Sequence, residues 1–128
     1  MISIGGATGD GGEADLAHPP VLAEGDLDFI VFDYLAEITM SIMARAKAAD
    51  PEKGYAIDFV SAIVAPHLQA IADSGVKLIS NAGGVNPEAC GRAIRQLIED
   101  AGLSLKVAVI TGDDLMPKLD EVLAAEPA

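Results

Sequence analysis

The chain has no tryptophan, one cysteine and few aromatic side chains, and each shortage narrows the classes of protein to which it can belong. A single cysteine excludes an intramolecular disulfide, which fits a reducing compartment. Aromatic residues make up 4% of the chain while hydrophobic residues make up 51%, so the core must be built from aliphatic side chains. That composition favours an α/β or all-α interior over a β-sandwich.

Basic residues and long apolar runs are also scarce. The chain has 8 Lys and Arg against 20 Asp and Glu, which gives a formal net charge of −12 at pH 7. No basic surface is therefore expected for nucleic acid or for an anionic membrane. No stretch reaches the ~20 apolar residues of a membrane span, and the first residues lack the pattern of a signal peptide. The sequence predicts a cytoplasmic protein with no nucleic-acid partner and no membrane partner.

Short apolar runs alternate with helix-like stretches along residues 1–128, which predicts a single α/β domain. The expected strands are 2–4, 29–32, 76–80 and 105–111, and the second and fourth are apolar on both faces, as in strands covered by helices on both sides. The expected helices are 13–16, 21–24, 35–49, 57–74 with a kink at Pro66, 87–101 and 115–125. The repeated strand–helix order implies parallel strands. The predicted fold class is therefore α/β, a Rossmann-like three-layer sandwich with a mostly parallel sheet.

The expected helix 35–49 has one apolar stripe at helical spacing, formed by Leu35, Ile38, Ile42, Ala46 and Ala49. In the expected helix 87–101, Cys90 shares a face with Ile94 and Leu97. We therefore expect Cys90 to be a buried structural thiol and not a nucleophile.

The loop 81–87, Asn-Ala-Gly-Gly-Val-Asn-Pro, is the most informative stretch because it connects the expected strand 76–80 to the expected helix 87–101. Asn86 has a local role as the helix cap, with Pro87 at the first helical position. Asn81 has no such role, and the pair Gly83 and Gly84 suggests that the backbone there closely approaches another group. We therefore predict that Asn81, Gly83, Gly84 and Asn86 bind a ligand, because open α/β sheets hold ligands at the carboxyl ends of their strands.

The glycine-rich segment Gly5–Gly12 follows the first expected strand and resembles a phosphate cradle. It matches neither the dinucleotide-binding pattern nor the P-loop pattern. Its glycines, Gly5 and Gly6 among them, can approach a ligand through backbone N–H groups, and a plain turn is an equal alternative.

Four acidic side chains follow the other expected strands. Asp33 and Glu37 lie four residues apart at a helix start, either as an acid–base pair or as a cap and a solvated acid. Asp113 and Asp114 either bind a metal or hydroxyls, or begin a helix. If all four converge, they share protons or need a cation. The candidate catalytic residues are Asp33, Glu37 and Asp113, and the candidate cofactor is Mg²⁺ or Mn²⁺ held by Asp33, Asp113 or Asp114.

Several ordered motifs between about residues 26 and 115 resemble one family. They are Asp33-Tyr-Leu-Ala-Glu-Ile-Thr-Met-Ser41, Asp50-Pro with Gly54-Tyr55 and Asp58-Phe59, the loop 81–87, and Gly112-Asp-Asp114. Together they are similar to the acyclic terpene utilisation family, the AtuA-like proteins formerly described as a domain of unknown function. The resemblance implies a cytoplasmic protein of citronellol- and geraniol-type catabolism that acts on or binds an acyl-CoA, with lyase-type or acid–base chemistry as one proposal. It also implies a truncated or short form of the family's longer N-terminal domain, with a shortened segment after Gly9.

Three functions stay open at this point. The first is binding of an anionic, acyl-CoA-type metabolite, with the glycine loops and helix N-termini meeting phosphate or carboxylate. The second is a non-catalytic binding or assembly domain, whose exposed apolar sheet surface would need a partner subunit or a second copy of the chain. The third is a nucleotide-binding enzyme that uses the Gly5–Gly12 loop.

Overall fold

The computed structural model describes residues 1–8 and 27–125. Within them, three strands form one open sheet in the order β1-β2-β3, with both strand pairs parallel: β1 (Ile4–Thr8), β2 (Phe29–Asp33) and β3 (Lys77–Ser80). The helices are α2 (Glu37–Ala49), α3 (Ala65–Ser74), α4 (Pro87–Asp100) and α5 (Leu119–Ala124), with a π-helical segment Phe59–Val64 and a 3-10 turn Met116–Lys118. The predicted α/β class and parallel strands are confirmed, whereas the expected helices 13–16 and 21–24 lie outside the described residues.

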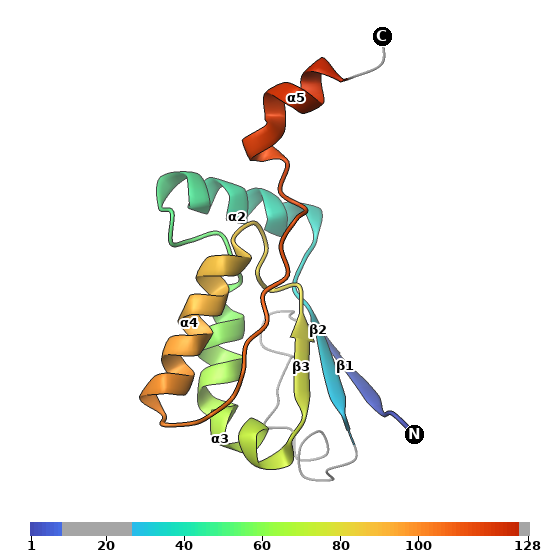
Figure 1. Ribbon diagram of the computed structural model, residues 1–128, viewed down its shortest axis with the longest axis vertical. Coiled ribbons are helices and arrows are strands. Elements are labelled where there is room, and N and C mark those ends of the chain that lie inside the picture. The colour runs from blue at the N-terminus through green and yellow to red at the C-terminus, as the bar shows by residue number, and fades with distance from the viewer. Residues whose placement is uncertain (9–26, 126–128) are drawn as a thin grey trace.

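The helices lie on one side of the sheet. Figure 1 shows α3 and α4 side by side next to the strands, α2 across their carboxyl ends, and α5 projecting away from the rest of the molecule. Ile30 and Phe32 of β2 point into the core and are each 1% exposed. Val31 and Ile79, which pair across the sheet, point the other way and are 38% and 52% exposed. The expectation that strand 29–32 is covered on both faces is therefore wrong within the described residues, because α3 and α4 both pack on the same face.

The helix expected at 57–74 continues past Pro66, with a change of helical pitch before it. Pro66 has no N–H group to donate, and the helix adapts with a wider turn. The backbone N–H of Ala65 donates to the carbonyl of Val60, five residues earlier, at the end of the π-helical segment. Four side chains of that segment are buried in the core: Phe59, Val60, Ile63 and Val64.

The predicted ends of α3 and α4 are confirmed. Gly75 ends α3 in the left-handed conformation, with φ of 72°. Asn86 caps α4, because its side-chain oxygen accepts a hydrogen bond from the N–H of Ala89 at 3.4 Å. Gly102 follows α4 with φ of 67°.

Helix α2 is placed differently from the expectation. It begins at Glu37, two residues later than predicted, and of its side chains only that of Met43 is buried. Ile38 and Ile42 of the predicted stripe are 76% and 59% exposed. The reason is that α2 crosses the carboxyl edge of the sheet (Figure 1), so its stripe has no sheet face to cover.

The strand predicted at 105–111 is absent from the described sheet. These residues are extended, yet no backbone ladder joins them to β3. They lie along α4, where Arg95 donates to the carbonyl oxygen of Val107 at 3.1 Å and Gly91 faces Val109. Every second side chain from Leu103 to Val109 is half-buried. A β-strand needs a partner edge, whereas this segment is held mainly by side chains.

The last predicted helix is shorter than expected. In place of one helix over 115–125, the chain forms the 3-10 turn and then α5, and no side chain of residues 111–125 is buried. Among the described helices, none combines the length and the apolar character required to span a bilayer.

Candidate functional site

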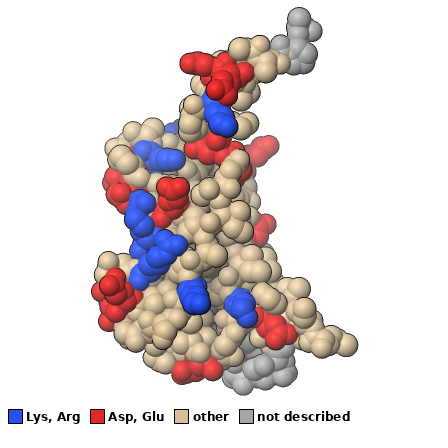
Figure 2. Space-filling view, in the orientation of Figure 1, with Lys and Arg blue, Asp and Glu red and all other residues tan. Residues whose placement is uncertain are grey.

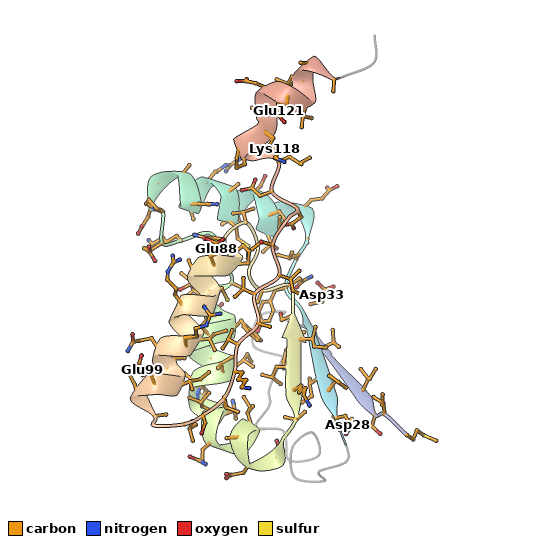
Figure 3. The ribbon with its side chains drawn as sticks, viewed as in Figure 1. Asp28, Asp33, Glu88, Glu99, Lys118 and Glu121 are labelled. Atoms are coloured by element: carbon orange, nitrogen blue, oxygen red, sulfur yellow. The ribbon has the colours of Figure 1, made fainter. Side chains whose placement is uncertain are left out.

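A cavity of about 550 Å³ opens at the carboxyl edge of the sheet. Its walls are residues 33–36 at the end of β2, the inner side of α2, and the loop 53–58. We call it the β2 pocket. Figure 3 places Asp33 at this edge and Asp28 at the opposite end of the same strand. Parallel α/β sheets hold their ligands at this edge.

The β2 pocket combines apolar walls with a few polar groups. Leu35, Ile42, Met43 and Ile57 supply aliphatic surface, whereas the polar side chains are those of Asp33, Tyr34, Thr39, Lys53, Tyr55 and Asp58. Burial is the main cause that raises the pKa of Tyr34 and of Tyr55, so both hydroxyls stay protonated at neutral pH and can donate hydrogen bonds. Such a lining suits a largely apolar ligand that carries a few polar atoms.

Asp33 is held by its neighbours in an ionised form. One of its carboxylate oxygens accepts hydrogen bonds from the side-chain amide of Asn81 at 2.9 Å and from the N–H of Leu35 at 3.1 Å. The hydrogen bond from Asn81, and then that from Leu35, lowers the pKa of Asp33. Asp33 can therefore accept a hydrogen bond or a proton at neutral pH, and it is a poor general acid.

A smaller cavity of about 280 Å³ lies beside the start of α4, and we call it the α4 pocket. Residues 84–88 and 111–115 line it together with Met40 and Lys47. The ammonium group of Lys47 donates to the carbonyl of Val85 at 2.9 Å and lies 3.8 Å from the carboxylate of Asp114. The segment 112–114 and residues of the loop 81–87 thus line the same pocket.

The loop 81–87 turns most of its polar groups towards the protein. Asn86 is buried, and its amide donates to the carbonyls of Pro51 and Lys53 at 2.8 Å each. The N–H of Val85 donates to the carbonyl of Gly54 at 3.0 Å, and the carbonyl of Ala82 accepts from Ala56 at 2.7 Å. The loop thereby holds residues 51–56 in place, which include part of the 53–58 wall of the β2 pocket.

Gly83 and Gly84 fit this role, because a side chain at either position would collide with the protein itself. A Cβ on Gly83 would meet Pro87, and a Cβ on Gly84 would meet the sulfur of Met43. Gly84 also has φ of 55°, which favours glycine. The close approach that the sequence suggested at this pair is an approach to other parts of the chain.

The predicted site residues are divided between the two pockets. Asp33 lines the β2 pocket, whereas Gly84, Asn86, Asp113 and Asp114 line the α4 pocket; Glu37, Asn81 and Gly83 line neither. Within residues 1–8 and 27–125, no group of three His, Cys, Asp or Glu side chains is arranged to hold a metal ion. The four carboxylates therefore do not form the single anionic cluster on which the Mg²⁺ or Mn²⁺ prediction depended.

The placement of Gly5 and Gly6 in a loop is wrong. Both lie inside β1, where they pair with Ile30 and Val31. A Cβ at position 5 would meet the side chain of Leu27 at 2.7 Å, so that side chain would have to shift. The rest of the predicted glycine loop, residues 9–12, falls outside the described part of the chain.

The sequence prediction did not include Lys53, Tyr55 and Asp58 among the site residues, although all three line the β2 pocket. Tyr55 and Asp58 belong to motifs that carry the family resemblance, which is the signal that could have identified them. The burial expected for Cys90 is confirmed, and this burial raises the pKa of its thiol to about 11.

The chain was compared with known proteins on three levels. No curated protein matches it, and no solved structure matches it. A family model does match: that of the acyclic terpene utilisation family protein AtuA aligns with residues 2–127, nearly the whole chain. The family that the sequence motifs indicated is thus confirmed, and the chain belongs to the acyclic terpene utilisation (AtuA) family.

Proposed function

We propose that this protein binds an acyl-CoA intermediate of acyclic terpenoid catabolism, of the citronellol or geraniol type, at the carboxyl edge of its sheet. Family membership suggests a function related to acyclic terpene utilisation. The observation that carries the proposal is the β2 pocket, which combines aliphatic walls with an ionised carboxylate and two tyrosine hydroxyls. Its volume of about 550 Å³ falls in the usual range for small-molecule sites.

In this proposal the branched acyl chain lies against Ile42 and Met43, where it is withdrawn from water. The carboxylate of Asp33 then accepts a hydrogen bond or a proton near the carbonyl end of the acyl group. Glu37 and Asp113 remain candidates for a second acid–base group. Glu37 opens α2 at this edge, and Asp113 lies in the α4 pocket.

The coenzyme part of the ligand needs positive charge and N–H donors. We place it towards the α4 pocket, which contains Lys47 and the first residues of α4. Figure 2 shows basic side chains on the surface where α4 lies in Figure 1, with acidic side chains above and below them. Our proposal also includes a Rossmann-like fold for the whole domain, which the parallel sheet supports.

The test is thermal unfolding of the purified chain with citronelloyl-CoA, geranoyl-CoA and free CoA, each with and without Mg²⁺. A ligand that binds only the native state raises the unfolding midpoint as its concentration increases. We expect both branched acyl-CoA thioesters to raise the midpoint more than free CoA does. No shift with either thioester would contradict the proposal.

Two variants on α2 make the test specific to the β2 pocket. Ile42→Asp places a charge on the apolar wall, and Ile38→Asp places the same charge one turn earlier on an exposed position outside the pocket. Both positions tolerate a polar residue, since both side chains are largely exposed. We expect Ile38→Asp to keep the ligand-induced shift and Ile42→Asp to lose it. Equal shifts in the two variants would place the ligand elsewhere.

Assembly with a second copy or a partner subunit is the second candidate function. The observation in its favour is a set of exposed apolar side chains on the sheet face opposite α3 and α4 and on α5: Val31, Ile79, Leu119, Val122 and Leu123. Sedimentation equilibrium of the chain over a range of concentrations tests self-association. A monomer at all concentrations would exclude a homo-oligomer of this chain.

A further inference from the structure

We infer that Asn81 is the positioning residue that holds the carboxylate of Asp33 at the β2 pocket. The inference rests on the proposed function, because the position of Asp33 matters for activity only if this pocket binds a ligand. It gives Asn81 a role that differs from the direct ligand contact expected from the sequence. Asn81 itself does not line the pocket, whereas Asp33 does.

The side chain of Asn81 connects the ends of two neighbouring strands. Its oxygen accepts a hydrogen bond from the N–H of Tyr34 at 2.8 Å, just after β2. Its nitrogen donates to one oxygen of the Asp33 carboxylate at 2.9 Å. Asn81 follows β3 directly, so a single amide joins the carboxyl ends of β2 and β3.

These hydrogen bonds fix which carboxylate oxygen of Asp33 is available. The oxygen that accepts from Asn81 also accepts from the N–H of Leu35, so it has two donors. No described residue donates a hydrogen bond to the other oxygen. The Asn81 amide therefore selects one orientation of Asp33 and leaves the second oxygen for a ligand in the pocket.

The hydrogen bond between Asn81 and Asp33 orients the carboxylate more than it stabilises the fold. Asp33 and Asn81 are both exposed, and an exposed hydrogen bond adds little net stability because water can replace it. Replacement by water would preserve the fold but would not preserve the direction of the carboxylate. An effect on binding larger than the effect on folding is thus the signature of this role.

The experiment measures the affinity for citronelloyl-CoA by calorimetry in a double-mutant cycle. We expect Asn81→Ala and Asp33→Asn each to weaken binding on the order of tenfold, and the double variant to bind no worse than Asp33→Asn alone. Additive losses would overturn the inference, because they would mean that Asn81 does not act through Asp33. The matched control is Gln69→Ala on α3, which breaks another exposed amide–carboxylate bond of 2.9 Å, to Asp73; it should leave affinity unchanged.

A third variant separates the two hydrogen bonds of Asn81. Asn81→Asp keeps an acceptor for the N–H of Tyr34 and loses the donor to Asp33. We expect it to bind as weakly as Asn81→Ala. Wild-type affinity in Asn81→Asp would overturn the inference. The exchanged pair Asp33→Asn with Asn81→Asp has the same net charge as the wild type, and we expect it to bind no better than Asp33→Asn alone, because its carboxylate is displaced to position 81. Wild-type affinity of the exchanged pair would overturn the inference.

A ligand-free measurement keeps this inference separate from the proposed function. Side-chain coupling constants from NMR report whether Asp33 occupies one rotamer or several. We expect one rotamer in the wild type and in Gln69→Ala, and averaging in Asn81→Ala. If the wild type binds no acyl-CoA but the rotamers change as stated, the proposed function fails and the positioning role remains. A single Asp33 rotamer in Asn81→Ala would overturn the positioning role.

Discussion

Two consecutive units at the end of the chain, residues 76–102 and residues 103–125, have similar patterns of apolar and polar residues but different structures. Each consists of an apolar run, a polar loop containing glycine, and a helix-like stretch. In the first unit the run forms β3 and the helix buries Ala89, Cys90 and Ile98. In the second unit the run joins no strand, and the helix buries nothing.

The difference lies in what each unit packs against. β3 pairs with β2 along its length, and α4 packs against α3 and the π-helical segment. The run after Gly102 packs along the side of α4, and among the described elements α5 contacts mainly the adjoining 3-10 turn. Apolar patterning favours an extended or helical conformation, but burial and a hydrogen-bonding edge supply most of its stability.

The largest expected effect comes from shortening the same side chain in both units. Ile98→Ala should lower the free energy of unfolding by about 2–4 kcal/mol, because it leaves a cavity in the core. Ile98 is 6% exposed and Ile110 is 90% exposed, so Ile110→Ala should change that free energy by about 0.5 kcal/mol or less. Urea unfolding of both variants checks this. Similar losses would show that residues 103–125 belong to the cooperative core.

A smaller difference in the free energy of unfolding is expected when the hydrogen-bonding side chain of each loop, Asn86 or Asp114, is removed. Asn86→Ala should cost about 2 kcal/mol, since it deletes the cap of α4 and leaves the carbonyls of Pro51 and Lys53 without their donor. Asp114→Ala removes an exposed hydrogen bond to the N–H of Met116 and should cost about 0.5 kcal/mol or less. Urea unfolding midpoints of the two variants give the comparison. Equal costs would contradict the structural difference between the loops.

A variant at the contact between the two units should loosen one and spare the other. In a helix interior, Gly→Ala normally stabilises by up to about 1 kcal/mol, but a Cβ on Gly91 would collide with Val109. We therefore expect Gly91→Ala to leave overall stability within about 0.5 kcal/mol. It should also loosen residues 103–110, seen as lower NMR order parameters of their backbone, while amide hydrogen exchange in α4 stays slow. Adding Val109→Ala removes the collision and should restore the usual gain. Faster exchange in α4 itself would mean that the units are not separable.

The Cys90 thiol gives the smallest effect at neutral pH, and its effect on stability appears only as the pH rises. Its pKa is raised by burial to about 11, so the protonated thiol is favoured in the folded state. Its contribution to stability is complete below the pKa of an unfolded cysteine, about 8.5, and is lost as pH rises towards 11. Urea unfolding at pH 7, 8.5 and 10 should therefore show a steeper decline for the wild type than for Cys90→Ala. Parallel declines would indicate that Cys90 is accessible to water.

Much of the fold could be predicted from local signals. The cap at Asn86, the proline after it and the glycines after α3 and α4 each act within a few residues, so they marked helix ends correctly. The conformation of residues 105–111 could not be predicted in the same way, because their apolar pattern is satisfied equally by a sheet edge or by the side of a helix. The outward stripe of α2 was missed for the same reason, since periodicity does not state which surface a helix meets.

The candidate site was predictable as a location and less so as an arrangement. The sequence placed Asp33, the loop 81–87 and the segment 112–114 at the carboxyl ends of strands, which is correct for the first two, because no described strand directly precedes residues 112–114. The structure adds that they surround two pockets, with Lys53 and Tyr55 on the wall of the larger one. The predicted ligand contacts of Asn81 and Asn86 remain predictions, although their amides already have protein partners.

The sequence by itself determined the parallel α/β class, the aliphatic core, the buried thiol and the limits of α4, because composition, periodicity and caps act through nearby residues. Only the tertiary structure decided which sheet face is covered, how the carboxylates divide between two pockets, and which groups form hydrogen bonds with Asn81. The two hydrogen bonds of Asn81 join it to Tyr34 and Asp33, which lie 47 and 48 positions earlier in the chain. Contacts at such separations depend on how strands and helices pack together, and no local pattern in this chain encodes them.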